Sequence, residues 1–366
     1  MPNIIFSENA QLNNSRIGKL YEPLKMFIQK EADDQEKAKN YENLLFKLDD
    51  SDNWAEAFVT SDDFDLWGDR AEGGVSKLDT FGETFKKVIE HAESGKGFSI
   101  TKKMMDDMSS RALEVKAKEL AQKFVDSNYR TRNMKMVQAL VQGGTPVGDL
   151  IEGKYIKVAG HKIDVTTADN QPLFSKSHKG GRAELHGEFT QSNYFYTSDK
   201  NLTADALVSY LDHLSVLGRN IKDENGNAMG YSFDTVIIPG DNYLLEQMMR
   251  RALGSGQFPG TNLNDICTQY GVKNLMILPE WTTVGTENRN QFMLMSSKAK
   301  DNLHGNQFLE RVPMDVQNWI DKATRNWDWD GYTRYGVGFP TYKHILRMVI
   351  DDAGTMSTLA TDIASV

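Results

Sequence analysis

A long run of helical periodicity that begins near Thr101 constrains the fold more than any other feature of the sequence. The run continues to Leu140 and is followed by GGTP at 143 to 146, which would stop a helix. Thr101 is a residue type that caps helix N-termini. The pattern predicts one helix of about forty residues, or roughly 60 Å. Two apolar stripes lie side by side along it, the first with Met105, Met108, Ala112 and Val115 and the second with Leu113, Ala117, Leu120 and Phe124.

Two different patterns precede this helix. Residues 20 to 48 place apolar side chains at helical spacing on either side of a charged run, which predicts two amphipathic helical pieces on an arm. Residues 62 to 100 contain six glycines with short mixed runs between them, and this favours an extended two-stranded hairpin. An isolated hairpin is only marginally stable in water. We therefore expect it to rest on the body of the fold or on another subunit.

The segment from about 146 to 310 predicts a mixed α/β domain. Strand patterns occur at 164 to 167, 189 to 196, 234 to 238, 274 to 278 and 291 to 296, and helical patterns at 203 to 217 and 243 to 253. After it, Val312, Met314 and Val316 alternate with polar residues, as in a half-buried strand. Its expected partners are the stretch at 326 to 339 and the continuation at 345 to 350. The fold class predicted is α+β.

The stretch NWDWDGYTRYGVGF at 326 to 339 carries five aromatic rings and allows two interpretations. In one strand, Trp327 and Trp329 share a face with Tyr335. Alternatively, Asp330-Gly331 is a tight hairpin turn that sets Trp327 opposite Arg334, in position for a cation–π pair. Both interpretations favour strand packing over a third hypothesis, a stacking platform for glycans or bases.

Composition restricts the classes of function. The formal charge of −9 argues against a protein that holds nucleic acid tightly through many phosphates. The single cysteine, Cys267, excludes an intrachain disulfide and fits a reducing compartment. The first residues lack the pattern of a signal peptide, and no apolar run approaches the roughly 20 residues of a membrane span.

Motifs for catalysis are missing. GxSxG, GxxxxGK[ST] and GxGxxG do not occur. Histidines 161, 178 and 186 lie near carboxylates, and the strongest enzyme hypothesis is a metal-dependent hydrolase that uses His178 and His186 with Glu184 or Glu188. Their spacing fits no known zinc-ligand motif. We therefore expect no enzyme activity and assign no catalytic, cofactor-binding or metal-binding residue.

Six short motifs, in this order, resemble the major capsid proteins of tailed bacteriophages with the HK97 fold, and most nearly the Mu-like head-subunit group. They are Glu72-Gly73-Gly74, Gly97-Phe98-Ser99-Ile100-Thr101, Leu173-Phe174-Ser175-Lys176-Ser177-His178, Leu202-Thr203-Ala204-Asp205-Ala206-Leu207, Phe233-Asp234-Thr235-Val236-Ile237-Ile238-Pro239 and Arg334-Tyr335-Gly336-Val337-Gly338. Together they span most of the chain.

The resemblance implies a domain order. Residues 1–61 would be an N-terminal arm, 62–100 the extended E-loop hairpin, 101–145 the spine helix of the peripheral domain and 146–310 the axial domain. Residues 311–366 would return to the peripheral domain as β-strands and a C-terminal tail.

The resemblance also implies a function without enzyme activity or cofactor. The chain would self-assemble, as hexamers and pentamers, into an icosahedral shell that encloses double-stranded phage DNA without sequence-specific binding. Its partners would include scaffold, portal and decoration proteins, and no membrane. It would be found in the virion capsid, after assembly in the cytoplasm of the bacterial host. An encapsulin-like compartment that encloses an enzyme cargo is the alternative within the same fold.

Overall fold

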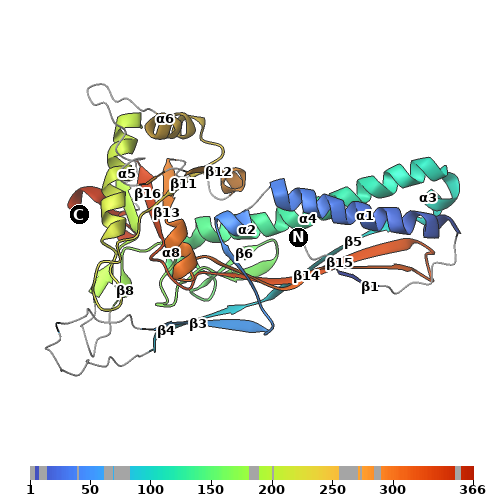
Figure 1. The fold of residues 1–366 in the computed structure, drawn as a ribbon, viewed down its shortest axis with the longest axis horizontal. Helices are drawn as coiled ribbons and strands as arrows, with labels where there is room; N and C mark the ends of the chain where they lie inside the picture. Colours follow the sequence, from blue (N-terminus) through green and yellow to red (C-terminus); the bar gives the residue numbers. More distant parts are fainter. Residues whose placement is uncertain are drawn as a thin grey trace. The chain divides into compact units, whose positions relative to one another are not determined.

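The computed structural model describes most of the chain. The described residues are 5–7, 15–38, 41–61, 69, 83–180, 189–199, 202–254, 271–272, 274–283, 290–350 and 356–366. They form two compact units (Figure 1). The first unit comprises Met1–Glu56, Glu90–Met136 and Phe308–Val337, and the second comprises Ala57–Ile89, Val137–Gln307 and Gly338–Val366.

The first unit places helices on a sheet. Its sheet has the order β1-β14-β15-β5, and β2 also pairs with β14. The strands are β1 (Ile5–Ser7), β2 (Lys47–Asp50), β5 (Ala92–Ile100), β14 (Gln307–Ile320) and β15 (Trp327–Gly338), and the helices are α1 (Ser15–Ala38), α2 (Tyr41–Leu44), α3 (Lys102–Asp107) and α4 (Ser110–Val141). Helices α1 and α4 lie side by side along one face of this sheet (Figure 1). The core forms between them and the inward side chains of β14 and β15.

The prediction of one forty-residue helix is wrong, because the chain breaks near its start. A six-residue helix, α3, is followed by the 32-residue α4. Between them Met108 has an extended backbone, with φ −88° and ψ 144°. The side chains of Thr101 and Ser109 each accept a hydrogen bond from a backbone N–H of the helix that follows. The predicted cap at Thr101 is thus confirmed, and a second cap starts α4.

The break decides which apolar stripe enters the core. Leu113, Ala117 and Phe124 of the second stripe are buried, whereas Val115 of the first stripe is 64% exposed. Because α4 starts anew at Ser110, its side chains are not in helical register with those of α3. The first stripe therefore faces the core at Met105 of α3 but faces solvent at Val115 of α4. The other end agrees with the prediction, since α4 ends at the GGTP stretch.

The aromatic stretch forms one straight strand. β15 runs through Asp330 and Gly331 without a turn, and its antiparallel register with β5 continues across both residues. The hairpin turn at these residues is therefore wrong. The cation–π pair that it implied is wrong as well, because Trp327 and Arg334 lie seven positions apart along the same strand.

Three of the four rings of β15 are buried in the first unit. Trp327 and Trp329 are each 1% exposed, and Tyr335 is 2% exposed. Trp329 stacks on Phe98 of β5, with 5.9 Å between ring centroids and 4° between planes. The Trp327 indole N–H donates to Asn318 Oδ1 at 3.2 Å. These three rings are strand packing, as predicted, and offer no open face to a glycan or a base. Tyr332 lies on the other face of the strand and is half-buried.

The second unit is built on a mixed sheet. The order of its described strands is β12-β11-β13-β16-β10-β17. Their bounds are Asn274–Leu278 for β12, Thr235–Pro239 for β11, Gln291–Met295 for β13, Ile345–Ile350 for β16, Tyr194–Thr197 for β10 and Thr361–Asp362 for β17. Helices α5 (Ala204–Arg219) and α6 (Tyr243–Gly254) share one apolar cluster with this sheet. Smaller elements are β6 (Tyr155–Val158), β7 (His161–Asp164), β8 (His178–Gly180), β9 (Phe189–Gln191) and α8 (Ser297–Asn302).

Most elements predicted in this unit are confirmed to within two residues, but three predictions are wrong. The strand predicted at 164 to 167 lies instead at His161–Asp164, as β7. Residues 345 to 350 do not continue the terminal strands of the first unit. As β16 they pair with β13 and β10 in the second unit. The predicted strand at 189 to 196 is two strands, because Asn193 lies between them and its side-chain amide donates to the carbonyls of Leu173 and Ile345.

Candidate functional site

A two-stranded ribbon, made of β3 (Ala55–Ser61) and β4 (Glu83–Glu90), pairs with no other strand among the described residues. It corresponds to the predicted hairpin at 62 to 100, with different bounds. The ribbon begins before residue 62 and ends at Glu90, and the later residues form β5 of the other sheet. The connecting residues 62–68 and 70–82 lie outside the described part of the chain.

One face of the ribbon is anchored to the second unit. The Lys87 ammonium lies 2.8 Å from Asp164 Oδ2 and donates to Thr166 Oγ1 at 3.0 Å. Burial lowers the pKa of Lys87, and the charge of Asp164 opposes that shift. Ile89 packs against Gly338, where an added Cβ would lie 2.7 Å from the isoleucine. These contacts confirm the expectation that the hairpin rests on the body of the fold at its base.

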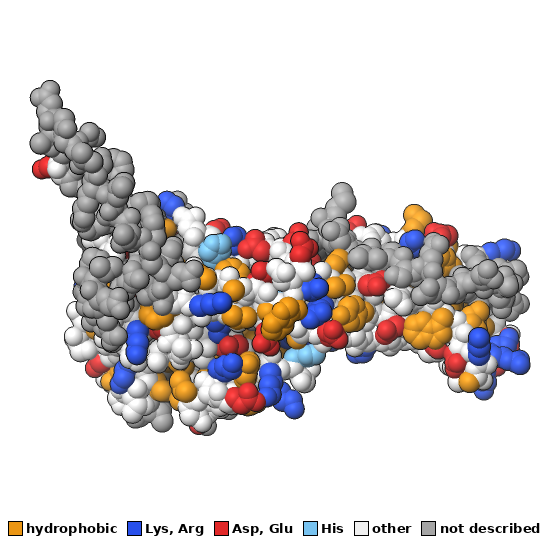
Figure 2. Space-filling view, turned by 90° about the horizontal axis from the view of Figure 1, so that it is seen from below, with side chains coloured by type: hydrophobic (Ala, Val, Ile, Leu, Met, Phe, Trp, Pro, Cys, Tyr) orange, Lys and Arg blue, Asp and Glu red, His pale blue; other side chains and the backbone are white. Residues whose placement is uncertain are grey.

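The opposite face of the ribbon is uncovered in the single chain. Val59 on β3 is 41% exposed and Val88 on β4 is 42% exposed, and Ala57 and Lys86 are exposed beside them. Hydrophobic side chains reach the surface among charged ones on the side where Figure 1 places the ribbon (Figure 2). β-Branched residues on a pleated surface suit contact with another surface. The ribbon is therefore fixed by one face and free to bind through the other.

The second candidate site was the histidine cluster. His178 is fully buried. Its Nδ1 lies 2.9 Å from Asp169 Oδ2 and its Nε2 lies 3.2 Å from the Leu173 carbonyl oxygen. Its ring stacks on Tyr342 at 3.7 Å between centroids. Both nitrogens are engaged, so neither presents a lone pair to a metal ion in this arrangement.

The other ligands predicted for a metal site with His178 were His186 and either Glu184 or Glu188. Glu184, His186 and Glu188 lie outside the described residues. Asp164, which the sequence placed near His161, is engaged with Lys87 instead. The neighbours of His178 in the structure are Asp169 and Tyr342. Neither belongs to a recognisable sequence motif, so the sequence alone could not have identified them. No group of three metal-ligating side chains occurs among the residues that the structure describes.

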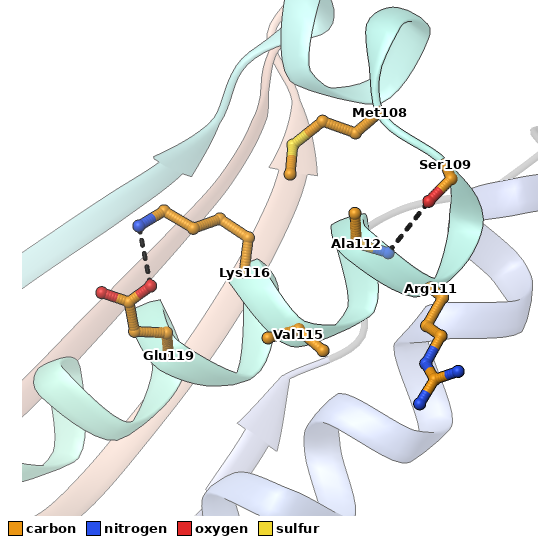
Figure 3. A pocket seen from close by; sticks show the side chains of 7 residues that line it. All are labelled: Met108, Ser109, Arg111, Ala112, Val115, Lys116 and Glu119. Atoms are coloured by element: carbon orange, nitrogen blue, oxygen red, sulfur yellow. Dashed lines mark hydrogen bonds and ion pairs between the residues drawn. The ribbon is translucent and has the colours of Figure 1, made fainter.

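A pocket of about 460 Å³ lies over the start of α4 (Figure 3). Met108 and Val115 contribute its apolar lining, and Lys116 pairs with Glu119 at 2.8 Å on its wall. The pocket results from the break between α3 and α4, and its polar lining residues are at least partly exposed. Within the described ranges, no helix is long and apolar enough to cross a membrane.

Comparisons with known proteins give structural similarity only. No protein-family profile and no curated protein sequence matches the chain. The mature capsid of bacteriophage PhiM1 matches with 13% identity and a TM-score of 0.45, over 84% of this chain and 86% of that one. The capsid of an empty GTA particle matches with 10% identity and a TM-score of 0.47, over 85% and 89%. A virus-like particle from Pyrococcus furiosus matches with 7% identity and a TM-score of 0.43, over 89% and 98%.

Proposed function

We propose that this chain is a major capsid protein, a subunit that self-assembles into an icosahedral shell around double-stranded phage DNA. The observation that carries the proposal is the ribbon, which is anchored through Lys87 and Ile89 and presents Val59 and Val88 to solvent. A second copy of the chain is the partner that would cover this face. The resemblance of the sequence motifs to HK97-fold capsid proteins supports the same conclusion, and the Mu-like head-subunit group is the subgroup that we propose.

The domain roles follow from the resemblance and from the elements. We infer that residues 1–54 act as the arm, since β3 belongs to the ribbon. The ribbon and its connection act as the E-loop, and α3, α4 and strands β5, β14 and β15 form the peripheral domain. The axial domain begins at about residue 146. Because β16 and β17 belong to the sheet of the second unit, we assign residues 338–366 to this domain and only 311–337 to the peripheral strands.

The proposed partners are chiefly further copies of the chain, as hexamers and pentamers, with scaffold, portal and decoration proteins around them. The enclosed DNA would be held without sequence-specific contacts. The charge of −9 supports this, because each phosphate that a protein neutralises strengthens binding to a genome that must later leave.

Sedimentation of the purified full-length chain, with and without its scaffold, tests the proposal. We expect large closed particles, and a compact monomer at every concentration would contradict a shell function. The particle contents separate the two kinds of container. Nuclease-protected DNA supports a phage head, whereas an enzyme cargo without DNA indicates the encapsulin-like alternative.

A further inference from the structure

Two arginines lie opposite each other in the sheet of the first unit. Two side-chain hydrogen bonds join β15 to β14 in one antiparallel register, from Trp327 to Asn318 and from Thr333 to Val312. In this register Arg334 of β15 is the direct neighbour of Arg311 of β14. Both alternate with the core residues of their strands, so both side chains lie on the face away from α1 and α4. Like charges directly opposite each other destabilise a sheet.

The acids of the sheet do not neutralise this pair. Glu93 of β5 is the strand partner of Arg334, but its Oε1 lies 3.8 Å from Nη1 of the arginine. A charge-assisted hydrogen bond is about 2.7–2.9 Å long. The next acids on the same face of β14 and β15 are Asp315 and Asp330, which lie four positions, or about 13 Å, along the strands.

Arg311 has even less compensation. Strand β2 also pairs with β14, but its carboxylates, Asp49 and Asp50, form no ion pair with Arg311, and Asp49 pairs with Lys47 at 3.3 Å. In the described part of the chain, Nη1 of Arg311 and Nε of Arg334 are buried without a hydrogen-bond partner. An unmade hydrogen bond of a buried charged group is costly. Both guanidinium groups therefore have donors left for a ligand.

Tyr332 adds a hydroxyl group to the same face. It lies two positions before Arg334 and is half-buried. Burial raises the pKa of Tyr332, Glu93 reinforces the shift, and the charges of Arg334 and Arg311 oppose it. The phenol therefore stays protonated at neutral pH and can donate a hydrogen bond. A planar guanidinium group matches the paired oxygens of a phosphate or a carboxylate.

We propose that Arg311 and Arg334, with Tyr332 beside them, form a binding site for one oxyanion, a phosphate or the carboxylate of a second copy of the chain. The oxyanion lies between the two guanidinium groups and removes their repulsion. Glu93 opposes binding, because its negative charge beside Arg334 repels the ligand. The site itself does not depend on shell assembly.

Thermal unfolding of the full-length chain in inorganic phosphate, compared with sodium chloride of the same ionic strength, tests the site. A ligand that binds only the folded chain stabilises it, so we expect phosphate to raise the melting temperature by about 2–4 °C over chloride. This shift should be lost in Arg311→Gln and in Arg334→Gln. No shift in the wild type, or the same shift in both variants, would overturn the proposal.

Arg250→Gln is the matched control. Arg250 lies on α6 and its Nε already pairs with Glu246 at 2.8 Å, so this variant should keep the wild-type shift. Glu93→Gln should show a larger shift than the wild type, because the competing charge is gone. An arginine pair that only stabilises the sheet would not give this increase. A smaller shift in Glu93→Gln would therefore count against the site.

Sedimentation in a phosphate-free buffer distinguishes the two sources of the oxyanion. The chain has 51 acidic and 42 basic residues, so a second copy can supply the carboxylate. In that case Arg311→Gln should self-associate less than Arg250→Gln, and added phosphate should weaken the association of the wild type. Equal association of the two variants assigns the site to free phosphate. A wild type that stays monomeric contradicts the shell function, but the phosphate shift would still support the site.

Discussion

Gly331 allows α4 to lie against β15 more closely than any other residue would. A Cβ at this position would be 2.4 Å from Cζ of Phe124. The Phe124 ring fills the space above the glycine and meets Phe98 edge-on at 5.3 Å. The Phe124 ring therefore requires a glycine at this position. The strand is straight here, although the dipeptide Asp330-Gly331 is typical of a turn.

Gly331→Ala should destabilise the first unit by about 1–3 kcal/mol, because the extra methyl group forces the Phe124 ring or the strand to move. Denaturant unfolding of the full-length chain measures the effect. Gly148→Ala is the control, since nothing lies within 4 Å of a Cβ there. If Gly331→Ala and Gly148→Ala are equally stable, the packing of the Phe124 ring does not require a glycine at position 331.

Lys135 is a buried cation in the same unit. It is 2% exposed. Its ammonium donates to Ser94 Oγ at 2.8 Å and lies 4.6 Å from the centroid of the Tyr335 ring. Burial lowers the pKa of Lys135 to about 8. Below that pH the folded state holds a charge that the unfolded chain accommodates more easily.

The Lys135→Met variant should be more stable than the wild type at pH 7, by up to about 3 kcal/mol, because the variant buries no charge at this position. Between about pH 8 and 10 the unfolded lysine still binds a proton that the folded one has lost, so wild-type stability rises with pH. The advantage of the variant should therefore shrink over this range. Unfolding free energies of both proteins at pH 7 and 10 test this. If Lys135→Met is more stable than the wild type by the same amount at both pH values, burial of the Lys135 charge does not destabilise the fold.

At the scale of elements, the sequence predicts the periodic segments well and their interruptions poorly. Strand β11 and helices α5 and α6 follow directly from their apolar patterns. The break at Met108 could not be predicted from the residue types around it, because methionine is a good helix former. The split at Asn193 depends on carbonyls far along the chain, which the local sequence cannot show.

The ribbon also depends on contacts that the local sequence cannot show. The glycines at 62 to 100 predicted an extended hairpin that needs support, but of the two ribbon strands only β4 lies within these bounds. The support itself comes from Asp164 and Gly338, which lie 77 and 249 positions from the residues that they contact, Lys87 and Ile89. Neither contact belongs to a motif. Sequence reasoning could therefore predict the kind of element but not the face that remains free.

The free face makes a specific prediction. Val59→Asp and Val88→Asp should each abolish or strongly reduce particle formation, because a carboxylate would have to be buried between subunits. Folding should be unchanged, since both side chains are already exposed. Sedimentation measures assembly and thermal unfolding measures the fold.

Val147→Asp is the control for these variants, with the same change of residue at a side chain that is 43% exposed. It should assemble like the wild type. If all three variants assemble equally, the ribbon does not mediate contact between subunits.

At the scale of the molecule, the sequence predicted the mixed α+β class and the order of elements, but not how the end of the chain is divided. It placed residues 311–366 in one domain, whereas the chain passes from β15 into the sheet of the second unit at about residue 338. The apolar pattern of β16 fits either sheet equally well. Only the pairing with β13 and β10 decides between them.

Electron microscopy of the particles formed by the full-length chain tests the central claim most directly. The proposed function predicts closed icosahedral shells of hexamers and pentamers in which the β3–β4 ribbon of each subunit lies with Val59 and Val88 against a neighbouring subunit. A protein that remains monomeric, or shells in which this face stays exposed to solvent, would contradict it.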